Sequence, residues 1–220
     1  MLKGIIFDMD GTITLTERLH YDAYQKVLKP YGLSYSYEEQ MKKYAGSGSK
    51  TIFSAVFAEH GKTISPQELD QCVARKHELY TKIVQDSKIE IVPGALEFIK
   101  KVHELGLKKI IATGNSNLPA VRMMLQKAGL ESYFPEILSI SEVARGKPFP
   151  DVFIEAARRI GCHHDECFVL EDAINGVTAA KAAGIRCIAF ETSTPREELL
   201  KAGASLVVKN YFELPPQLTE

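Results

Sequence analysis

The amino-acid sequence predicts an α/β fold in which helices cover both faces of a doubly wound parallel sheet, with a helical domain inserted near the N-terminus. Three observations predict this class. Short apolar runs rich in β-branched residues recur along the chain, as expected for strands buried on both faces. Helical stretches that end in glycine precede several of these runs, as in HELG before LKKIIAT. The stretch from residue 16 to residue 90 has helical patterns and no such run.

The apolar runs predict six strands, of which one is weaker than the others. We expect them at residues 3–8, 108–112, 136–140 (the weaker one), 166–170, 185–190 and 205–208. Helices that alternate with strands favour parallel pairing, because a parallel pair needs a long crossover connection. The expected core is therefore a Rossmann-like parallel sheet wrapped by helices.

The segment between the first two strands is expected to be helical. Its apolar periodicity predicts helices at residues 18–28, 51–60 and 67–85. Pro93-Gly94 then marks the return to the sheet. Helices grouped without strands inside an α/β chain indicate an insertion. We therefore predict that residues 1–15 and 91–220 form the α/β core and that residues 16–90 form a helical domain.

The composition is that of an ordinary soluble globular protein. Twenty-seven basic and twenty-eight acidic residues leave a formal charge of -1, without a basic stripe, so we do not expect a nucleic-acid partner. No apolar stretch reaches the roughly 20 residues that span a bilayer, so we expect no membrane association. The four cysteines form no CxxC pair and indicate reduced thiols in a cytoplasmic protein. Without a heptad seam, we expect a monomer.

One short segment, Cys162 to Cys167, raises the possibility of a zinc site. It reads Cys-His-His-Asp-Glu-Cys, but no second ligand pair stands at finger-like spacing. A polar turn between a helix and a strand is the better interpretation.

Polar groups follow four of the expected strands, at the point where each strand ends. They are Asp8 and Asp10 after the first, Thr113-Gly114-Asn115 after the second, Lys147 after the weaker strand, and Glu171-Asp172 after the next. Because reactive groups gather at the carboxyl ends of parallel strands, we expect these side chains to lie together.

The chemistry of these groups indicates a cation and a phosphoryl group. Carboxylates a few ångströms apart repel one another, and desolvation raises their pKa values. A hard cation such as Mg2+ prefers oxygen ligands and offsets that repulsion. The lysine and the hydroxyl would then balance the charge of phosphoryl oxygens.

Four motifs resemble those of the haloacid dehalogenase superfamily and occur in the same order. They are IIFDMDGT, IIATGNS, GKPFPD and VLEDAINGV. The match covers the whole α/β core, and the helical insertion resembles the cap domain of that superfamily. The greatest likeness is to the sugar-phosphate branch, which holds β-phosphoglucomutase and small sugar-phosphate phosphatases.

The resemblance implies a role for each motif residue. Asp8 would be the nucleophile that forms an aspartyl phosphate. Asp10 would be the general acid and base. The phosphoryl oxygens would be held by Thr113, Gly114, Asn115 and Lys147. The cofactor Mg2+ would be bound by Asp8, the main-chain carbonyl of Asp10, and Asp172, with Glu171 close behind.

In the enzymes that this sequence resembles, the cap contacts the part of the substrate that lies beyond the phosphoryl group. Four positions here are candidates for that contact: His20, Gly46, Lys50 and Lys76. His20 and Lys76 fall where β-phosphoglucomutases carry residues that close the cap and help control Asp10. A solvated helix face would also explain them. The arginine that mutases carry in the cap loop is missing, and Ser49 and Lys50 stand there instead.

These observations favour a Mg2+-dependent phosphatase that acts on a small phosphorylated metabolite, a sugar or polyol phosphate, through an aspartyl phosphate. A phosphomutase of the β-phosphoglucomutase type is the alternative, although a mutase must hold a bisphosphate intermediate by both ends. A non-catalytic, receiver-like signalling module is a remote third hypothesis. Receivers also group acidic residues, a hydroxyl, a lysine and Mg2+ on a parallel sheet, but they lack a helical insertion.

Overall fold

The computed structural model describes residues 2–218 and contains a six-stranded sheet. The strands are β1 (Gly4–Phe7), β2 (Lys108–Thr113), β3 (Ile137–Ser139), β4 (Cys167–Glu171), β5 (Arg186–Phe190) and β6 (Leu206–Val208). Their order is β3-β2-β1-β4-β5-β6, and every neighbouring pair is parallel. The ends of all six strands lie within one residue of the expected ranges, so the predicted strands and fold class are confirmed.

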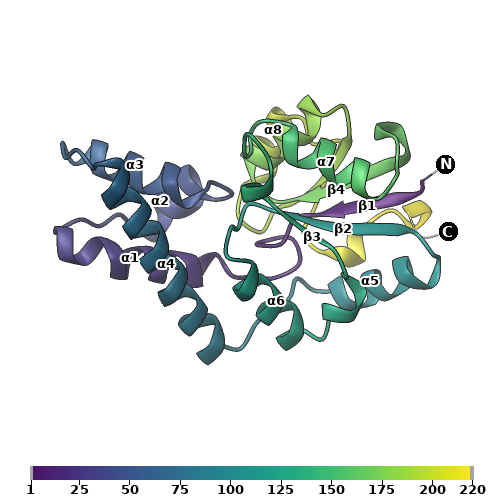
Figure 1. The fold of residues 1–220 in the computed structure, drawn as a ribbon. Helices are drawn as coiled ribbons and strands as arrows, with labels where there is room; N and C mark the ends of the chain where they lie inside the picture. Colours follow the sequence, from purple (N-terminus) through teal and green to yellow (C-terminus); the bar gives the residue numbers. More distant parts are fainter. Residues whose placement is uncertain (1, 219–220) are drawn as a thin grey trace.

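Helices cover both faces of the sheet (Figure 1). They are α5 (Ala95–Glu104), α6 (Leu118–Lys127), α7 (Asp151–Arg159), α8 (Ile174–Ala182) and α9 (Arg196–Ala202). Side chains of β1 alternate between two hydrophobic clusters, because successive strand residues point to opposite faces. Ile5 and Phe7 pack with residues of α5 and α6, whereas Ile6 packs with residues of α7 and α8. This two-sided burial is why the strands are almost continuously apolar.

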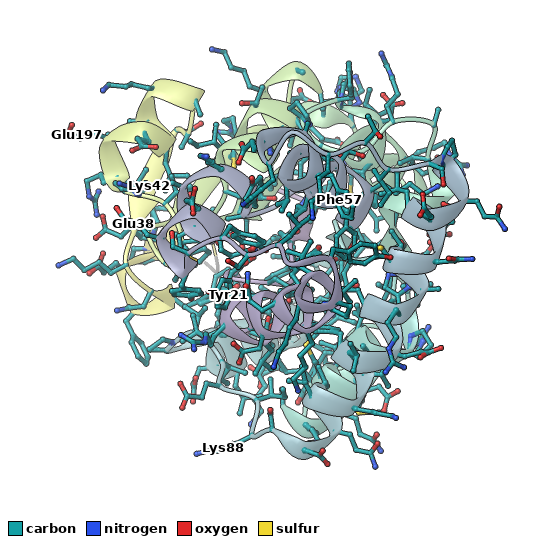
Figure 2. All side chains as sticks on the ribbon, turned by 90° about the vertical axis from the view of Figure 1, so that its left-hand side faces the viewer. Tyr21, Glu38, Lys42, Phe57, Lys88 and Glu197 are labelled. Carbon is teal, nitrogen blue, oxygen red and sulfur yellow. The ribbon has the colours of Figure 1, made fainter. Side chains whose placement is uncertain are left out.

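The chain between β1 and β2 is helical, and Figure 1 shows it beside the sheet. It contains α1 (Glu17–Leu28), α2 (Tyr37–Glu39), α3 (Ser49–Glu59) and α4 (Pro66–Asp86), with a π-helical turn at Gln40–Tyr44. The three predicted helices are confirmed, and α2 and the π-helical turn were not expected. A third hydrophobic cluster lies wholly within this inserted segment. Viewed from this side in Figure 2, Glu38 and Lys42 lie on the outer surface. The domain boundaries themselves stay a prediction.

Short 3-10 turns connect several elements, at Lys29–Tyr31, Glu131–Tyr133, Ile140–Glu142, His164–Glu166, Tyr211–Glu213 and Pro216–Leu218. The turn at His164–Glu166 confirms the polar turn expected between Cys162 and Cys167. Among the described residues, none of the helices has the length and hydrophobicity needed to cross a bilayer.

Two features join the helical insertion to the sheet. The entering and leaving segments pair with each other: the Leu15 N–H donates to the Glu90 carbonyl (2.8 Å), and the Val92 N–H donates to the Ile13 carbonyl (3.0 Å). The C-terminal end of α4 also packs against α6. There Lys127 Nζ donates to the last carbonyls of the helix and its following turn, those of Val84, Gln85 and Ser87. This end of α4 is therefore fixed to the core.

Candidate active site

Lys147 joins two carboxylates at the carboxyl edge of the sheet. Its Nζ lies 2.5 Å from Asp8 Oδ1 and 2.6 Å from Glu171 Oε1. Asp8 directly follows β1, and its N–H donates to the Leu170 carbonyl of β4, which carries the strand pairing one residue further. All three side chains are at least nine-tenths buried. The structure thus brings together three chain-distant residues that the sequence assigned to one site.

Glu171 has partners on both carboxylate oxygens. Oε1 accepts from Lys147, and Oε2 accepts from the main-chain N–H groups of Asp172 and Ala173, both at 2.8 Å. Gly176 makes room for this carboxylate, because a Cβ built there would lie 1.7 Å from Glu171 Oε1. The geometry makes Glu171 an anchor that orients Lys147 and the start of α8, close behind the expected metal ligands.

Asp172 approaches the first motif at Gly11. A Cβ at position 11 would lie 1.9 Å from Asp172 Oδ2, and Gly11 has a φ of 79°, where side chains are disfavoured. Among the described residues, Asp172 has no lysine or arginine ion pair, although it is 3% exposed. A buried carboxylate without a cationic partner is costly.

The carboxylates here have strongly shifted proton affinities. Burial, reinforced by the negative charge of Glu171, raises the pKa of Asp8 to about 8, against the opposing effect of Lys147. Burial and the charges of Glu171 and Asp8 raise the pKa of Asp172 well above its ordinary range. The pKa of Lys147 is raised because its two carboxylate partners outweigh the effect of burial. If all three carboxylates were ionised, the cluster would carry more negative charge than one lysine neutralises, and the raised pKa values reflect that cost.

These oxygen ligands suit a magnesium ion that is coordinated by only a few protein groups. Within residues 2–218, no three Asp, Glu, His or Cys side chains are grouped as a complete metal site. Asp8 and Asp172 would contribute two carboxylates, and Asp10 its main-chain carbonyl. Mg2+ typically keeps several waters and takes one or two carboxylates plus substrate phosphate oxygens. The excess negative charge at Asp8 and Asp172 is what such a cation offsets.

The loop after β2 presents polar groups without using all of them. Thr113 Oγ1 accepts from the Asn115 N–H (3.0 Å), and Asn115 Oδ1 accepts from the Asn117 N–H (3.0 Å). Asn115 Nδ2 is buried and has no hydrogen-bond partner among residues 2–218. An unpaired buried donor is unusual in a folded protein. Beside Lys147 and Gly114, which line the same cavity, this donor fits a phosphoryl oxygen.

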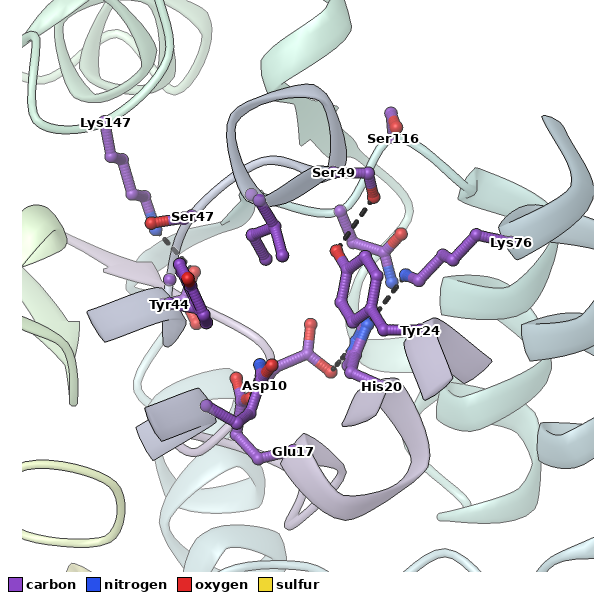
Figure 3. Close-up of a pocket in the computed structure, with 16 residues that line it drawn as sticks. Asp10, Glu17, His20, Tyr24, Tyr44, Ser47, Ser49, Lys76, Ser116 and Lys147 are labelled. Atoms are coloured by element: carbon purple, nitrogen blue, oxygen red, sulfur yellow. Dashed lines mark hydrogen bonds and ion pairs between the residues drawn. The ribbon is translucent and has the colours of Figure 1, made fainter. Parts of the chain in front are cut away.

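Asp10 contacts the helical insertion through His20 (Figure 3). Asp10 Oδ1 lies 3.1 Å from His20 Nε2 and accepts from Thr16 Oγ1 at 2.5 Å. His20 Nδ1 lies 2.8 Å from Lys76 Nζ. An ammonium group only donates, so Nδ1 accepts and Nε2 carries the hydrogen that Asp10 accepts. Lys76 and His20 thus orient the carboxylate of Asp10 from two helices of the insertion, α4 and α1.

This contact chain changes the proton affinity at both ends. Burial alone would raise the pKa of Asp10, but interactions with His20 and Thr16 outweigh it and the pKa is lowered. Burial lowers the pKa of Lys76 to about 8, although Asp10 and Glu17 oppose the effect. The ammonium lies 4.4 Å from the centre of the Tyr80 ring, a cation–π contact that partly offsets burial.

The site opens into a cavity of about 40 Å³ between the core and the helical insertion. Core residues in its wall are Asp8, Asp10, Gly114, Asn115, Ser116 and Lys147, and insertion residues are Glu17, His20, Tyr24, Gln40, Tyr44, Gly46, Ser47, Ser49, Ile52 and Lys76. A cleft of about 720 Å³ between segments 46–51 and 140–149 adjoins it and shares five wall residues with it, namely Gly46, Ser47, Ser49, Ser116 and Lys147. A water occupies roughly 10–15 Å³ by this measure, so the cavity has room for a phosphoryl-sized group.

Three of the four cap candidates line the cavity: His20, Gly46 and Lys76. Lys50 does not. Its Nζ lies 2.6 Å from Asp70 Oδ1, and both side chains are more than three-fifths exposed. Lys50 lines the adjoining cleft instead, so a contact between Lys50 and the substrate stays a prediction.

Several cavity residues were not identified from the sequence, namely Glu17, Tyr24, Gln40, Tyr44 and Ile52. Helical spacing could have found two of them. Glu17 lies three residues before His20 and Tyr24 four residues after it, so all three share one face of α1. Gln40 carries no such signal, because it reaches the cavity from the unexpected π-helical turn.

Comparisons with known proteins agree with this geometry. A family model described as haloacid dehalogenase-like hydrolase matches residues 5–190. Fructose-1-phosphate phosphatase YqaB of Escherichia coli is 33% identical over 186 residues, covering 84% of this chain and 94% of that protein. A phosphorylated carbohydrates phosphatase of Thermotoga maritima is 29% identical over 214 residues, covering 94% of each.

Solved structures of similar proteins also match this chain over nearly its whole length. CbbY from Rhodobacter sphaeroides in complex with xylulose-(1,5)bisphosphate has a TM-score of 0.87 and 28% identity, with 97% of this chain and 96% of that chain covered. The same protein in complex with phosphate has a TM-score of 0.85. The four motifs meet at one edge of the sheet, and the relatives resemble this chain in both sequence and fold. The chain is therefore an enzyme that belongs to the haloacid dehalogenase-like hydrolase family.

Proposed function

We propose that this enzyme is a Mg2+-dependent phosphatase that hydrolyses a small phosphorylated sugar or polyol through an aspartyl-phosphate intermediate. The observation that carries the proposal is the placement of Asp8, held by Lys147, in the same cavity wall as Asp10. One carboxylate is held by a lysine beside a candidate cation site, and the other is held by His20. A nucleophile and an acid/base catalyst need these two environments.

In the first step, a carboxylate oxygen of Asp8 attacks phosphorus as the bond to the leaving oxygen breaks. Asp10 gives its proton to that oxygen, so the alcohol departs neutral. Lys147, Asn115 Nδ2 and the Gly114 backbone would hold the phosphoryl oxygens. When bound by Asp8, the Asp10 carbonyl and Asp172, Mg2+ would supply charge neutralisation for the phosphoryl group and the carboxylates.

In the second step, Asp10 removes a proton from water, which attacks phosphorus and breaks the bond to Asp8. Inorganic phosphate leaves, and Asp8 returns to its carboxylate form. His20 favours the charged form of Asp10 and therefore this base role. A phosphate dianion bound next to Asp10 would raise its pKa again, which would prepare Asp10 for the acid role in the next turnover.

We propose that movement of the helical insertion admits the substrate. The cavity of about 40 Å³ holds a phosphoryl-sized group but leaves little space for an attached sugar. Opening of the insertion about the paired segments at Leu15–Glu90 and Ile13–Val92 would admit it, and closing would bring His20 and Lys76 back to Asp10.

A β-phosphoglucomutase-type mutase is the second candidate, favoured by the contact chain from Lys76 through His20 to Asp10. Hydrolysis is favoured by the cap loop. The loop residues that line the cavity are Gly46, Ser47 and Ser49, none of which is cationic, and Lys50 is paired with Asp70 outside it. A second phosphate inside this cavity would therefore meet no cation from this loop, whereas one in the adjoining cleft would meet Lys50.

The test is phosphate release from a panel of sugar phosphates, glycerol phosphate, nucleotides and phosphoglycolate, measured with Mg2+ and with EDTA. We expect release that needs Mg2+ and is lost, by about 10³-fold or more, in Asp8→Asn. Asp22→Asn, an exposed aspartate on α1, is the matched control. Full activity of Asp8→Asn would refute the nucleophile assignment. Faster formation of glucose 6-phosphate than of free phosphate from β-glucose 1-phosphate plus a bisphosphate primer would favour the mutase.

A further inference from the structure

Glu17 is an acidic side chain in the cavity wall that the proposed mechanism does not use. It lies on α1, one helical turn before His20, and it lines the cavity together with Asp10 (Figure 3). A carboxylate inside a site that binds an anionic phosphate is unfavourable unless it has its own partner in the substrate. The position of Glu17 therefore needs an explanation beyond phosphate binding.

A chain of hydrogen bonds orients this carboxylate. Gln40 Nε2 donates to Glu17 Oε2 (3.0 Å), and Gln40 Oε1 accepts from the Tyr35 hydroxyl (2.6 Å). The tyrosine contact determines which end of the Gln40 amide faces Glu17. Within the described residues, Glu17 Oε1 has no hydrogen-bond partner, so one oriented acceptor remains available in the cavity.

The rest of the insertion wall is polar and mostly uncharged. Tyr24 and Ser49 present hydroxyls that bond each other at 2.9 Å, and Ser47 presents another, 3.1 Å from Asn175 Nδ2. Lys76, the cation of this wall, contacts His20. A leaving group with hydroxyls would find acceptors and donors here, whereas a purely apolar one would leave Glu17 Oε1 buried and unpaired.

Resting on the proposed phosphatase function, we infer that Glu17 recognises the leaving group by accepting a hydrogen bond from one of its hydroxyls. The substrate class is then a phosphate monoester of a polyhydroxylated alcohol, with a hydroxyl near the ester oxygen. Glu17 and Asp10 line the same cavity, so we expect the recognised hydroxyl on the same side of the substrate as the leaving oxygen.

The experiment compares substrates that differ in their hydroxyls. Wild-type enzyme is assayed with fructose 1-phosphate, glucose 6-phosphate, erythrose 4-phosphate and glycerol 1-phosphate, and with propyl phosphate, which lacks every hydroxyl. We expect the best of the four to exceed propyl phosphate in kcat/KM by about 10-fold or more, the value of a charge-assisted hydrogen bond. Equal kcat/KM values would overturn the inference and leave the phosphatase proposal standing. No phosphate release from any of the five would count against the phosphatase function itself.

Variants then assign the preference to Glu17. Glu17→Gln should reduce kcat/KM for the best polyol phosphate by roughly 10-fold more than for propyl phosphate. Gln40→Met, which removes the orienting donor, should shift the same ratio in the same direction by less. Glu38→Gln, an exposed glutamate paired with Lys42, should leave the ratio unchanged. Equal losses for both substrates in Glu17→Gln would show that Glu17 acts through Asp10, and would overturn the inference.

Discussion

Replacing Gly176 by alanine tests the site architecture at a residue that touches no substrate. Gly176 lies inside α8, where alanine normally stabilises a helix by about 1 kcal/mol relative to glycine. The added methyl would lie 1.7 Å from Glu171 Oε1, so the buried carboxylate must move. We therefore expect the opposite sign, a loss of stability.

The magnitude follows from what Glu171 holds. Overpacking costs about 1–3 kcal/mol. Displacing the carboxylate weakens buried hydrogen bonds to Lys147 and to the N–H groups of Asp172 and Ala173, at about 1–3 kcal/mol for each group left unpaired. If one of these hydrogen bonds is lost, the overpacking cost and the hydrogen-bond cost together, minus the gain in helix propensity, give a net destabilisation of about 3 kcal/mol. Lys147 would also lose its orientation, so phosphatase activity should fall at least about 10-fold.

Urea unfolding followed by circular dichroism at pH 7 measures the stability, and kcat/KM for phosphate release measures the activity. Ser54→Ala, at an exposed position in α3, is the control and should gain a few tenths of a kcal/mol, about the difference in helix propensity. A Gly176→Ala protein that is as stable and as active as the wild type would refute the proposed role of the Glu171 anchor.

Two further predictions concern Lys76 and the candidate cation site. Lys76→Met should stabilise the protein at pH 7 by up to about 3 kcal/mol while lowering activity, because the folded protein depresses the lysine pKa to about 8. The folded state then binds fewer protons than the unfolded state between pH 8 and the ordinary lysine pKa, so the stability of the wild type should rise with pH in that window and that of the variant should not. Thermal melts at pH 7 to 10 measure this pH dependence. A variant that is less stable than the wild type at pH 7 would contradict the prediction. Mg2+ should raise the Tm, by the equivalent of about 2.7 kcal/mol at 100 times its dissociation constant. Because the pKa of Asp8 is raised to about 8, the rise in Tm caused by Mg2+ should be larger at pH 8 than at pH 5. Asp172→Asn should abolish this rise. If Asp172→Asn showed the same rise in Tm as the wild type, Asp172 would not be one of the proposed ligands.

The core of the fold was predictable because its pattern is local. Each buried strand is a short apolar run, and Gly106, just after the end of α5 at Glu104, has the expected left-handed φ of 67°. Parallel pairing brings the carboxyl ends of neighbouring strands to one edge. Asp8, Lys147 and Glu171 were therefore predictable as one group, although Lys147 is 139 residues from Asp8.

The cap side of the site was less predictable because it depends on how helices pack. Lys50 carries the right charge, but it pairs with Asp70 on α4 and lines the adjoining cleft instead of the cavity. Glu17 and Gln40 read as ordinary polar residues, and the contact between them joins α1 to a π-helical turn that hydrophobic periodicity does not indicate.

The sequence by itself determined the strands, the parallel sheet and the polar groups at its edge, because hydrophobic period and strand ends are properties of neighbouring residues. Tertiary structure alone decided which side chains face the cavity. His20 and Lys76 meet across 56 residues, Glu17 turns inward, and Lys50 turns outward. Those outcomes depend on the packing of α1, α3 and α4 and on competing ion partners, which no local pattern contains.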